Sequence, residues 1–234
     1  MEKQSLIQLL EGNSYPGRGI VLGRSGDDQY AIAVYFIMGR SENSRNRIFV
    51  PTRDGIRTEA HDPSKMTDPS LIIYHPVRQV GRGLIVSNGD QTDTIREYML
   101  EGRTIVEALH SREFEPDAPN YTPRISGLLS PDGSFKLSIV KSADGDPSCC
   151  CRYFYHYDAP LPGEGRFIHT YQGDGAPLPS FEGEPVRVTL DAPDPETLAD
   201  QLWAALNPDN KVSLFVRYTA LEGGDYRDAI RNKF

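Results

Sequence analysis

Short apolar runs separated by turn residues dominate this chain, a pattern that favours strands joined in hairpins. The longest run, residues 30–38, is almost wholly apolar and predicts a strand that is buried on both faces. Pro-Asp-Gly at residues 131–133 predicts a tight turn between two strands. Further strands are expected at residues 18–24, 71–74, 84–86, 124–129, 134–140, 152–157, 166–171, 186–190 and 211–218.

Helical patterns are fewer. Asp194 followed by Pro195 is a cap with a proline in the first turn, and predicts a helix that continues to about residue 206. Thr94 and Glu97 have the spacing of a capping box, which predicts that a helix over residues 94–110 begins there. Two shorter helices are expected at residues 2–11 and 225–231, whereas residues 51–70 are expected to be irregular.

The balance of these elements indicates a fold class. Strands in hairpins with few helices lack the regular alternation of a doubly wound sheet. We therefore expect an α+β protein, with helices on the outer faces of its sheets and one domain over residues 1–234. The chain is long enough to bury a good core, and 38% of its residues are hydrophobic.

Signals for membranes and secretion are missing from the pattern. The longest apolar runs are far shorter than the roughly 18 residues of a membrane helix. The first five residues, Met-Glu-Lys-Gln-Ser, lack the apolar core of a signal peptide. We expect a cytoplasmic protein that does not bind membranes.

Charge is distributed unevenly along the chain. There are 25 basic and 33 acidic side chains, for a net charge of −8, yet residues 15–57 contain seven arginines against four acidic residues. An acidic protein repels a polyanion, so nucleic acid is a poor partner. The arginine fork matches phosphate and carboxylate oxygens, and Arg40, Arg45 and Arg47 directly follow the long apolar run. The pattern favours a site for a small anion, with a solvated turn as the alternative.

The cysteines and histidines do not predict a metal site. Cys149, Cys150 and Cys151 are adjacent, so they are badly placed to bridge one another, and no other cysteine is present. A zinc site needs separated ligands, and the nearby His156 is one candidate too few. We expect these cysteines to belong to a strand or loop without a catalytic role.

Four polar segments lie in order across residues 15–126. They are Tyr15-Pro-Gly-Arg18 with Gly23-Arg24, Gly39-Arg40-Ser41 through Asn46-Arg47, Val86-Ser-Asn-Gly-Asp-Gln-Thr-Asp93, and Asn120-Tyr-Thr-Pro-Arg-Ile-Ser126. Each segment alone is a weak signal, but together and in this order they resemble the archaeal-type IMP cyclohydrolases. Residues 127–234 add little that can be matched segment by segment.

The resemblance implies a four-layer αββα sandwich like that of the N-terminal nucleophile hydrolases. It implies ring closure of 5-formamidoimidazole-4-carboxamide ribotide to inosine monophosphate, with loss of water, in purine synthesis. It implies neither a metal nor an organic cofactor. The chain departs from the hydrolase superfamily because no recognisable processing site would place a Cys, Ser or Thr at a freed N-terminus as the nucleophile. Ser5 could be this nucleophile, but no feature of the sequence points to it. We therefore expect the fold without the N-terminal nucleophile.

Ring closure in this ribotide requires proton transfer and charge stabilisation, because proximity of the reacting groups is built into the substrate. Arginines suit the charge on the formyl oxygen and the phosphate, with Arg40 and Arg47 as first choices. The resemblance adds Tyr74, as a partner of the formyl oxygen, and Glu115, as the base if burial raises its pKa. Arg40, Tyr74 and Glu115 are the catalytic candidates. A core tyrosine and a surface glutamate are the alternatives for the last two.

Polar side chains from several segments are candidates for substrate binding. Asn88 and Gln91 offer donors and acceptors that match a carboxamide edge or ribose hydroxyls, and Asp93 can accept from a ribose hydroxyl. For this segment, the alternative is an ordinary helix-capping loop. For the segment that contains Asn120, Thr122 and Arg124, the alternative is turn chemistry around Pro123. The full set is Arg18, Arg24, Asn46, Arg47, Asn88, Gln91, Asp93, Asn120, Thr122 and Arg124.

Two other functions stay open on the sequence alone. The chain could bind a purine nucleotide without turning it over, or it could hydrolyse an unrelated amide with a free Ser or Cys. The expected partner is a small purine ribotide, and the sequence leaves a homo-oligomer open.

Overall fold

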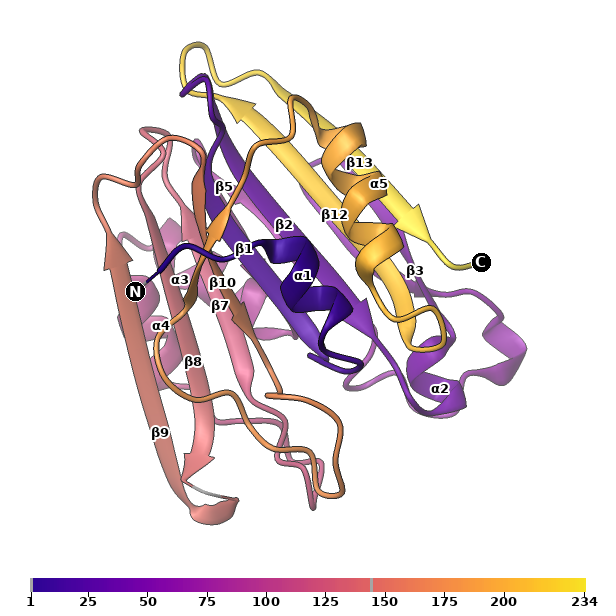
Figure 1. Ribbon diagram of the computed structural model, residues 1–234. Helices are drawn as coiled ribbons and strands as arrows, with labels where there is room; N and C mark the ends of the chain where they lie inside the picture. Colours follow the sequence, from indigo (N-terminus) through magenta and orange to yellow (C-terminus); the bar gives the residue numbers. More distant parts are fainter. Residues whose placement is uncertain (1, 144) are drawn as a thin grey trace.

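Two antiparallel sheets form the centre of the molecule (Figure 1). The computed structural model describes residues 2–143 and 145–234. Over these residues, the first sheet has the order β11-β10-β1-β2-β12-β13 and the second the order β3-β4-β5-β6-β7-β8-β9. The first contains β1 (Arg18–Arg24), β2 (Tyr30–Met38), β10 (Glu164–His169), β11 (Val186–Thr189), β12 (Lys211–Ala220) and β13 (Tyr226–Asn232). The second contains β3 (Arg47–Thr52), β4 (Gly55–Ala60), β5 (Val77–Val80), β6 (Gly83–Ser87), β7 (Arg124–Leu129), β8 (Phe135–Ala143) and β9 (Asp146–Tyr157).

Helices cover the outer face of each sheet, so that helix, sheet, sheet and helix follow one another. The first sheet packs against α1 (Leu6–Glu11) and α5 (Pro195–Ala205), and the second against α3 (Gln91–Leu100) and α4 (Ile105–His110). The expected α+β class, with helices outside two sheets, is confirmed. The short α2 (Glu42–Arg45) and a 3₁₀ turn (Pro63–Lys65) belong to connections.

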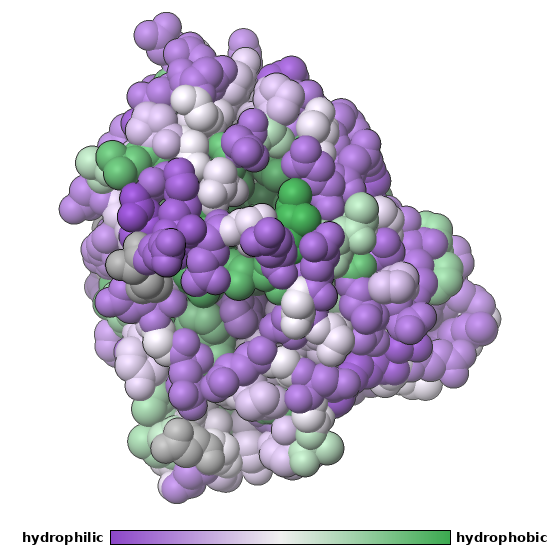
Figure 2. Space-filling view, in the orientation of Figure 1, coloured by the Kyte–Doolittle hydropathy of each residue, from purple (hydrophilic) through white to green (hydrophobic). Residues whose placement is uncertain are grey.

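The outer surface has the polarity expected of amphipathic helices. Hydrophilic residues cover most of the face that carries α1 and α5, and apolar residues gather in a hollow near its centre (Figure 2). In the described part of the chain, no helix combines the length and the apolar character needed to cross a membrane.

Strand β2 shows why the longest apolar run has no polar positions. Ala31, Ala33, Tyr35 and Ile37 face the second sheet, whereas the residues between them pack in the core under α1 and α5. Burial of each large apolar side chain contributes roughly 1.5–3 kcal/mol. The prediction of a strand buried on both faces is confirmed.

One end of the sandwich collects the polar segments singled out in the sequence. β1 begins there at Arg18, which pairs with Ile37 near the end of β2. β3 begins at Arg47, after the short connection from β2. In the second sheet β6 ends where β7 begins, with Ser87 opposite Ser126. The antiparallel order thus brings together segments that are far apart in the chain.

Three predictions of local structure are wrong: a helix at residues 225–231, an irregular segment at residues 51–70 and a strand at residues 71–74. Residues 225–231 belong to a strand, because β13 pairs with β12 along its length and Ala229 enters the core. Residues 51–70 include β4, which pairs with β3. Residues 71–74 lie in turns, and the unpredicted β5 follows them. Pairing with a neighbouring strand determined the conformation of the first two segments, and local sequence pattern carries little information about pairing.

The predicted helix over residues 94–110 is two helices. α3 ends before Gly102, whose φ of +78° lies in the left-handed region that favours glycine. The capping box is formed by Thr104 and Glu107, which bond each other's main-chain N–H groups, and starts α4. The box predicted at Thr94 is therefore wrong. The helix capped by Asp194 is confirmed.

Candidate active site

Two arginines from different sheets lie near each other between the sheets. Arg18 begins β1 and Arg47 begins β3, and both side chains are buried. Arg47 is 0% exposed. Its Nε donates to the Ser44 carbonyl at 2.8 Å, but neither of its terminal nitrogens has a partner. Because a buried cation without an acceptor is costly, these free donors make Arg47 a candidate for binding an oxygen of a ligand.

The two guanidinium groups have different surroundings. Burial lowers the pKa of Arg47, and the positive charge of Arg18 lowers it further, against the opposing effect of nearby tyrosines. Burial also disfavours the charge of Arg18, but Glu115 and the hydroxyls of neighbouring tyrosines outweigh this effect and raise the pKa of Arg18. Arg47 is therefore the less compensated cation and the stronger candidate for binding an anionic oxygen.

A pair of buried tyrosines lies beside these arginines. The hydroxyls of Tyr35, on β2, and Tyr74 are 2.8 Å apart. Burial raises the pKa of Tyr35 well above its usual value, the Tyr74 hydroxyl raises it further, and Arg18 and Arg47 partly offset the shift. The Tyr74 main chain is fixed by bonds to Thr58 on β4. One hydroxyl of the pair donates to the other.

Glu115 supplies the carboxyl group of the cluster. It is 2% exposed, its Oε2 lies 4.0 Å from Arg18 Nη2, and its Oε1 has no partner. Burial raises the pKa of Glu115 to about 7, although Arg18 and Arg124 oppose the shift. A Cβ on Gly89 would lie 2.6 Å from both Arg124 Nη1 and Gln91 Oε1, so the glycine allows these two side chains to pack beside the carboxyl group. A carboxyl group with this pKa can accept and donate protons near neutral pH.

Three aromatic residues complete the cluster and were not among the sequence candidates: Tyr15, Tyr35 and Tyr171. The rings of Tyr15 and Tyr171 stack with centroids 6.0 Å apart, and both hydroxyls act on the charge of Arg18. Tyr15 stands first in the first resembling segment, which was a usable signal. Tyr35 has the pattern of a core residue, and Tyr171 lies in the half of the chain where no segment could be matched.

The candidates Asn88, Gln91 and Arg124 brace one another next to Glu115. Asn88 Oδ1 accepts from the main-chain N–H of Ile125 and from Gln91 Nε2. Arg124 donates to Gln91 Oε1 at 2.8 Å, to Asp90 and to the Glu113 carbonyl. Their donors and acceptors are largely used within this network. In the structure these side chains hold the start of α3 against β7.

The remaining candidates are spread more widely. Thr122 is buried within the cluster and bonds to Tyr171. Asn46 bonds the main chain of Asp62, and Asn120 accepts from the main-chain N–H of Leu178. Two candidates lie outside the cluster. Asp93 pairs with Arg78 and lies near His75, and Arg24, at the other end of β1, pairs with Asp28.

Arg40 lies at the surface near this cluster. Its side chain is 37% exposed, and Nη1 donates to Asp174 Oδ1 at 2.6 Å and to the Gly175 carbonyl at 2.9 Å. Its guanidinium group stands 5.2 Å from the centroid of the Tyr15 ring. Arg40 thus links the segment after β2 to the loop that follows Tyr171. The catalytic role expected for Arg40 stays a prediction.

Arg40→Ala is expected to change KM more than kcat, by about tenfold or less, because exposed ion pairs are weak. Asp174→Ala should have a similar effect, and the double variant should be no worse than either single one if the pair acts as a unit. Steady-state kinetics at low and high salt would check this. A loss in kcat confined to Arg40→Ala would show that the guanidinium group acts on the reacting atoms.

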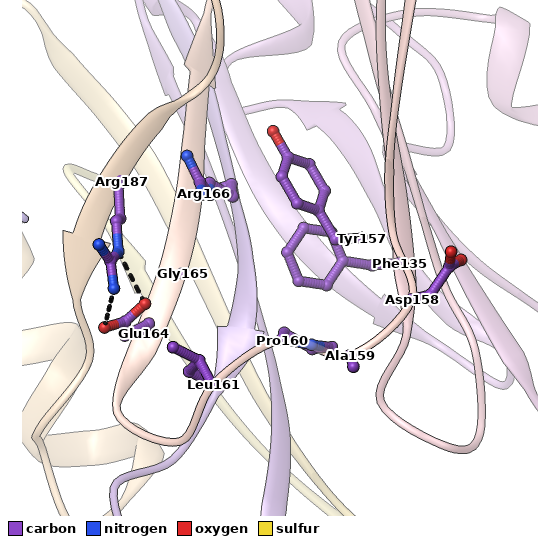
Figure 3. A pocket seen from close by; sticks show the side chains of 10 residues that line it. All are labelled: Phe135, Tyr157, Asp158, Ala159, Pro160, Leu161, Glu164, Gly165, Arg166 and Arg187. Carbon is purple, nitrogen blue, oxygen red and sulfur yellow. Dashed lines mark hydrogen bonds and ion pairs between the residues drawn. The ribbon is translucent and has the colours of Figure 1, made fainter. Parts of the chain in front are cut away.

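A separate cavity of about 170 Å³ lies between the sheets near the Arg24 end of β1 (Figure 3). Arg166 stands 5.0 Å from the centroid of the Tyr157 ring there, and Arg187 bonds to both carboxyl oxygens of Glu164. None of the residues predicted for the site lines this cavity. Among residues 2–143 and 145–234, no three His, Cys, Asp or Glu side chains form a group that could hold a metal ion.

Comparisons with known proteins connect this chain to one family. A family model described as IMP cyclohydrolase-like protein matches residues 15–224. The IMP cyclohydrolase of Methanopyrus kandleri is 31% identical over 186 residues, which cover 77% of this chain and 84% of that protein. That of Halobacterium salinarum is 33% identical over 132 residues, 55% of this chain and 63% of that protein. That of Methanococcus aeolicus is 25% identical over 182 residues, 68% of this chain and 89% of that protein.

Proposed function

This chain belongs to the IMP cyclohydrolase-like family, and on that premise we propose that it closes the ring of 5-formamidoimidazole-4-carboxamide ribotide to give inosine monophosphate and water. The proposal is carried by one observation: the two buried terminal nitrogens of Arg47 lack a partner. Hydroxyls and a carboxyl group surround them, from Tyr35, Tyr74 and Glu115. A small substrate with a carbonyl oxygen and exchangeable N–H protons suits these groups.

The first step joins the carboxamide nitrogen to the formyl carbon. Glu115 takes a proton from the nitrogen as the new C–N bond forms and the electron pair of the C=O bond moves to oxygen. Arg47 stabilises the charge that develops on this oxygen, since its N–H groups are fixed in a site shielded from water. Glu115 then returns the proton to the oxygen, which gives a hydroxyl adduct.

The second step removes water. The former formamido nitrogen releases its proton, the C–O bond breaks, and the hydroxyl group leaves with a proton as water while the C=N bond of the purine ring forms. Glu115, with a pKa near 7, can carry this proton as well. Because one hydroxyl of the Tyr35–Tyr74 pair donates to the other, the second hydroxyl keeps its proton free to donate to the departing oxygen. One acid–base group therefore serves both steps, without a covalent intermediate.

We assign the sandwich to the fold of the N-terminal nucleophile hydrolases, with different chemistry. The order helix, sheet, sheet, helix supports this assignment. Ser5 caps α1, where its hydroxyl accepts from the main-chain N–H of Gln8. Because α1 packs on the outer face of the first sheet and the proposed site lies between the sheets, Ser5 takes no part in the reaction.

Turnover is the test of this function. Purified protein incubated with the formamido ribotide is expected to form inosine monophosphate faster than the spontaneous rate, as followed by product absorbance. Tight binding of inosine monophosphate without turnover would identify the alternative, a non-catalytic nucleotide-binding protein. If the protein neither binds the nucleotide nor accelerates its formation, the proposal is rejected.

A further inference from the structure

A hydrogen-bonded chain of three side chains ends at the candidate active site. Asp117 Oδ2 accepts from the Thr122 hydroxyl at 2.5 Å, and Asp117 Oδ1 accepts from the Thr122 main-chain N–H at 2.7 Å. The Thr122 oxygen also lies 2.5 Å from the Tyr171 hydroxyl oxygen. Thr122 and Tyr171 are 0% and 1% exposed, so both hydroxyls are shielded from solvent.

The number of protons available decides the direction of this chain. An ionised carboxylate only accepts, and threonine has one hydroxyl proton. That proton must lie between Thr122 and Asp117, because two oxygens 2.5 Å apart repel each other unless a proton lies between them. The Tyr171 proton must then point to the Thr122 oxygen. Because the Tyr171 proton is used in the bond to Thr122, the Tyr171 oxygen can only accept a hydrogen bond, through its lone pairs, from any further partner.

Tyr171 is close to the charged groups of the site. Its hydroxyl interacts electrostatically with Arg18 and Glu115, and its ring stacks on Tyr15. Burial raises the pKa of Tyr171 to about 12, with Arg18 and the Thr122 bond opposing the shift. The hydroxyl therefore keeps its proton at neutral pH, and the direction of the chain is preserved.

We propose that Asp117, acting through Thr122, fixes Tyr171 as a hydrogen-bond acceptor for the ligand, so that the site selects a hydroxyl or ring N–H donor at this position. This inference rests on the proposed function, because the ribotide and its product carry such donors. Tyr171 contacts the ligand, whereas Asp117 and Thr122 are positioning residues. A role for Asp117 in closing the turn would explain the bond that it accepts from the Thr122 main-chain N–H. It would not explain the buried, hydrogen-bonded hydroxyls of Thr122 and Tyr171.

Asp117→Asn reverses the direction in which the hydrogen bonds between Asp117, Thr122 and Tyr171 are donated. Its carbonyl must stay with the Thr122 main-chain N–H, so its amide group donates to the Thr122 oxygen. Thr122 then donates to Tyr171, and the Tyr171 proton turns toward the ligand, where a donor now meets a donor. Calorimetry is expected to show inosine monophosphate binding about tenfold or more weakly to Asp117→Asn. Tyr171→Phe, which keeps the stacked ring, should bind it about three- to tenfold more weakly.

Thr122→Val provides the matched background, because it cuts the chain between the other two residues. In that background Asp117→Asn is expected to change the affinity by less than about twofold, since no hydroxyl transmits the reversal. Circular dichroism and thermal unfolding check that each variant folds. If the Thr122 or Asp117 variants fail to fold, Tyr171→Phe, which loses a single oxygen, still decides the role of Tyr171.

Analogues of the product identify the donor. The 2′-deoxy, 3′-deoxy and 1-methyl forms of inosine monophosphate each lack one donor. The form that lacks the donor bound by Tyr171 should bind wild type and Tyr171→Phe equally, while the other two keep their preference for wild type. If the three hydrogen-bonded side chains had a purely structural role, Tyr171→Phe would lower the affinity for all three analogues alike.

The outcomes separate this inference from the proposed reaction. Equal affinity of wild type, Asp117→Asn and Tyr171→Phe for inosine monophosphate overturns the role of Tyr171 and leaves the cyclohydrolase reaction standing. Selective loss in the variants, with no turnover by wild type, supports the role of Tyr171 and overturns the reaction. A wild-type protein that does not bind inosine monophosphate overturns both.

Discussion

Arg47→Met is expected to lower kcat by about 10²–10³-fold while the protein keeps or gains thermal stability. Both terminal nitrogens of this buried side chain lack a protein partner, which supports our proposal that its charge serves a ligand rather than the fold. An uncompensated buried cation costs stability, and methionine fills a similar space without charge. The substitution therefore removes a destabilising buried charge from the folded state, and it also removes the group proposed to stabilise the formyl oxygen. Thermal unfolding and steady-state kinetics on one preparation measure both effects.

Arg57→Met is the matched control for this variant. Arg57 lies on β4, next to β3, but its side chain is 53% exposed and pairs with Glu59. Its kcat is expected to stay within about twofold of wild type, because surface pairs contribute little. A strongly destabilised Arg47→Met variant with normal kcat would show that Arg47 is a structural cation and would remove it from the mechanism.

Glu115→Gln is expected to lower kcat by about 10²–10⁴-fold, the usual contribution of a general acid–base group. Glutamine keeps the size of the side chain but cannot take the carboxamide proton. Glu113→Gln is the control, because Glu113 lies two residues away on the same loop with its side chain exposed. If Glu115→Gln retains the wild-type kcat, proton transfer must be assigned to another group.

The pH profile of wild type tests the same residue. Burial raises the pKa of Glu115 to about 7, and the first step requires the ionised form. The value of kcat/KM is therefore expected to fall about tenfold per pH unit below that pKa and to level off above it. The residual activity of Glu115→Gln should lack this inflection, whereas that of Glu113→Gln should keep it.

Stability should follow pH in the opposite sense. The Glu115 pKa rises from 4.5 to about 7 on folding, so between these values the folded chain binds the proton and the unfolded chain has released it. This contribution is complete below about pH 4.5 and is lost as pH rises to about 7, by on the order of 3 kcal/mol. Urea unfolding at pH 5 and pH 8 should show a smaller loss in Glu115→Gln. An equal loss would place Glu115 in a more solvated environment.

The sequence predicted the fold best where burial alone decides the local structure. The apolar run of β2 and the Asp194 cap of α5 were predicted from local pattern and are confirmed. The pairing of β13 with β12 was not predictable, since its pattern of exposed polar residues allows a helix as well. The break at Gly102 depends on a left-handed backbone that one glycine makes possible without requiring it.

The site was predictable from the sequence only in part, for geometric reasons. Arg18 and Arg47 were chosen for their chemistry, and the structure brings them together with Tyr74 and Glu115, which the family resemblance supplied. Arg24 has the same chemistry as Arg18. However, it lies six residues further along an extended strand, about 20 Å away. Residue type therefore indicates what a side chain can bind, and strand position decides whether it reaches the site.

A crystal structure with inosine monophosphate bound tests the central claim most directly. The account predicts the nucleotide between the two sheets, with one of its oxygens within hydrogen-bond distance of a terminal nitrogen of Arg47 and its N1 edge facing Glu115. A nucleotide bound elsewhere, such as in the cavity beside Arg166, with the Arg47 nitrogens still unpartnered, would contradict it.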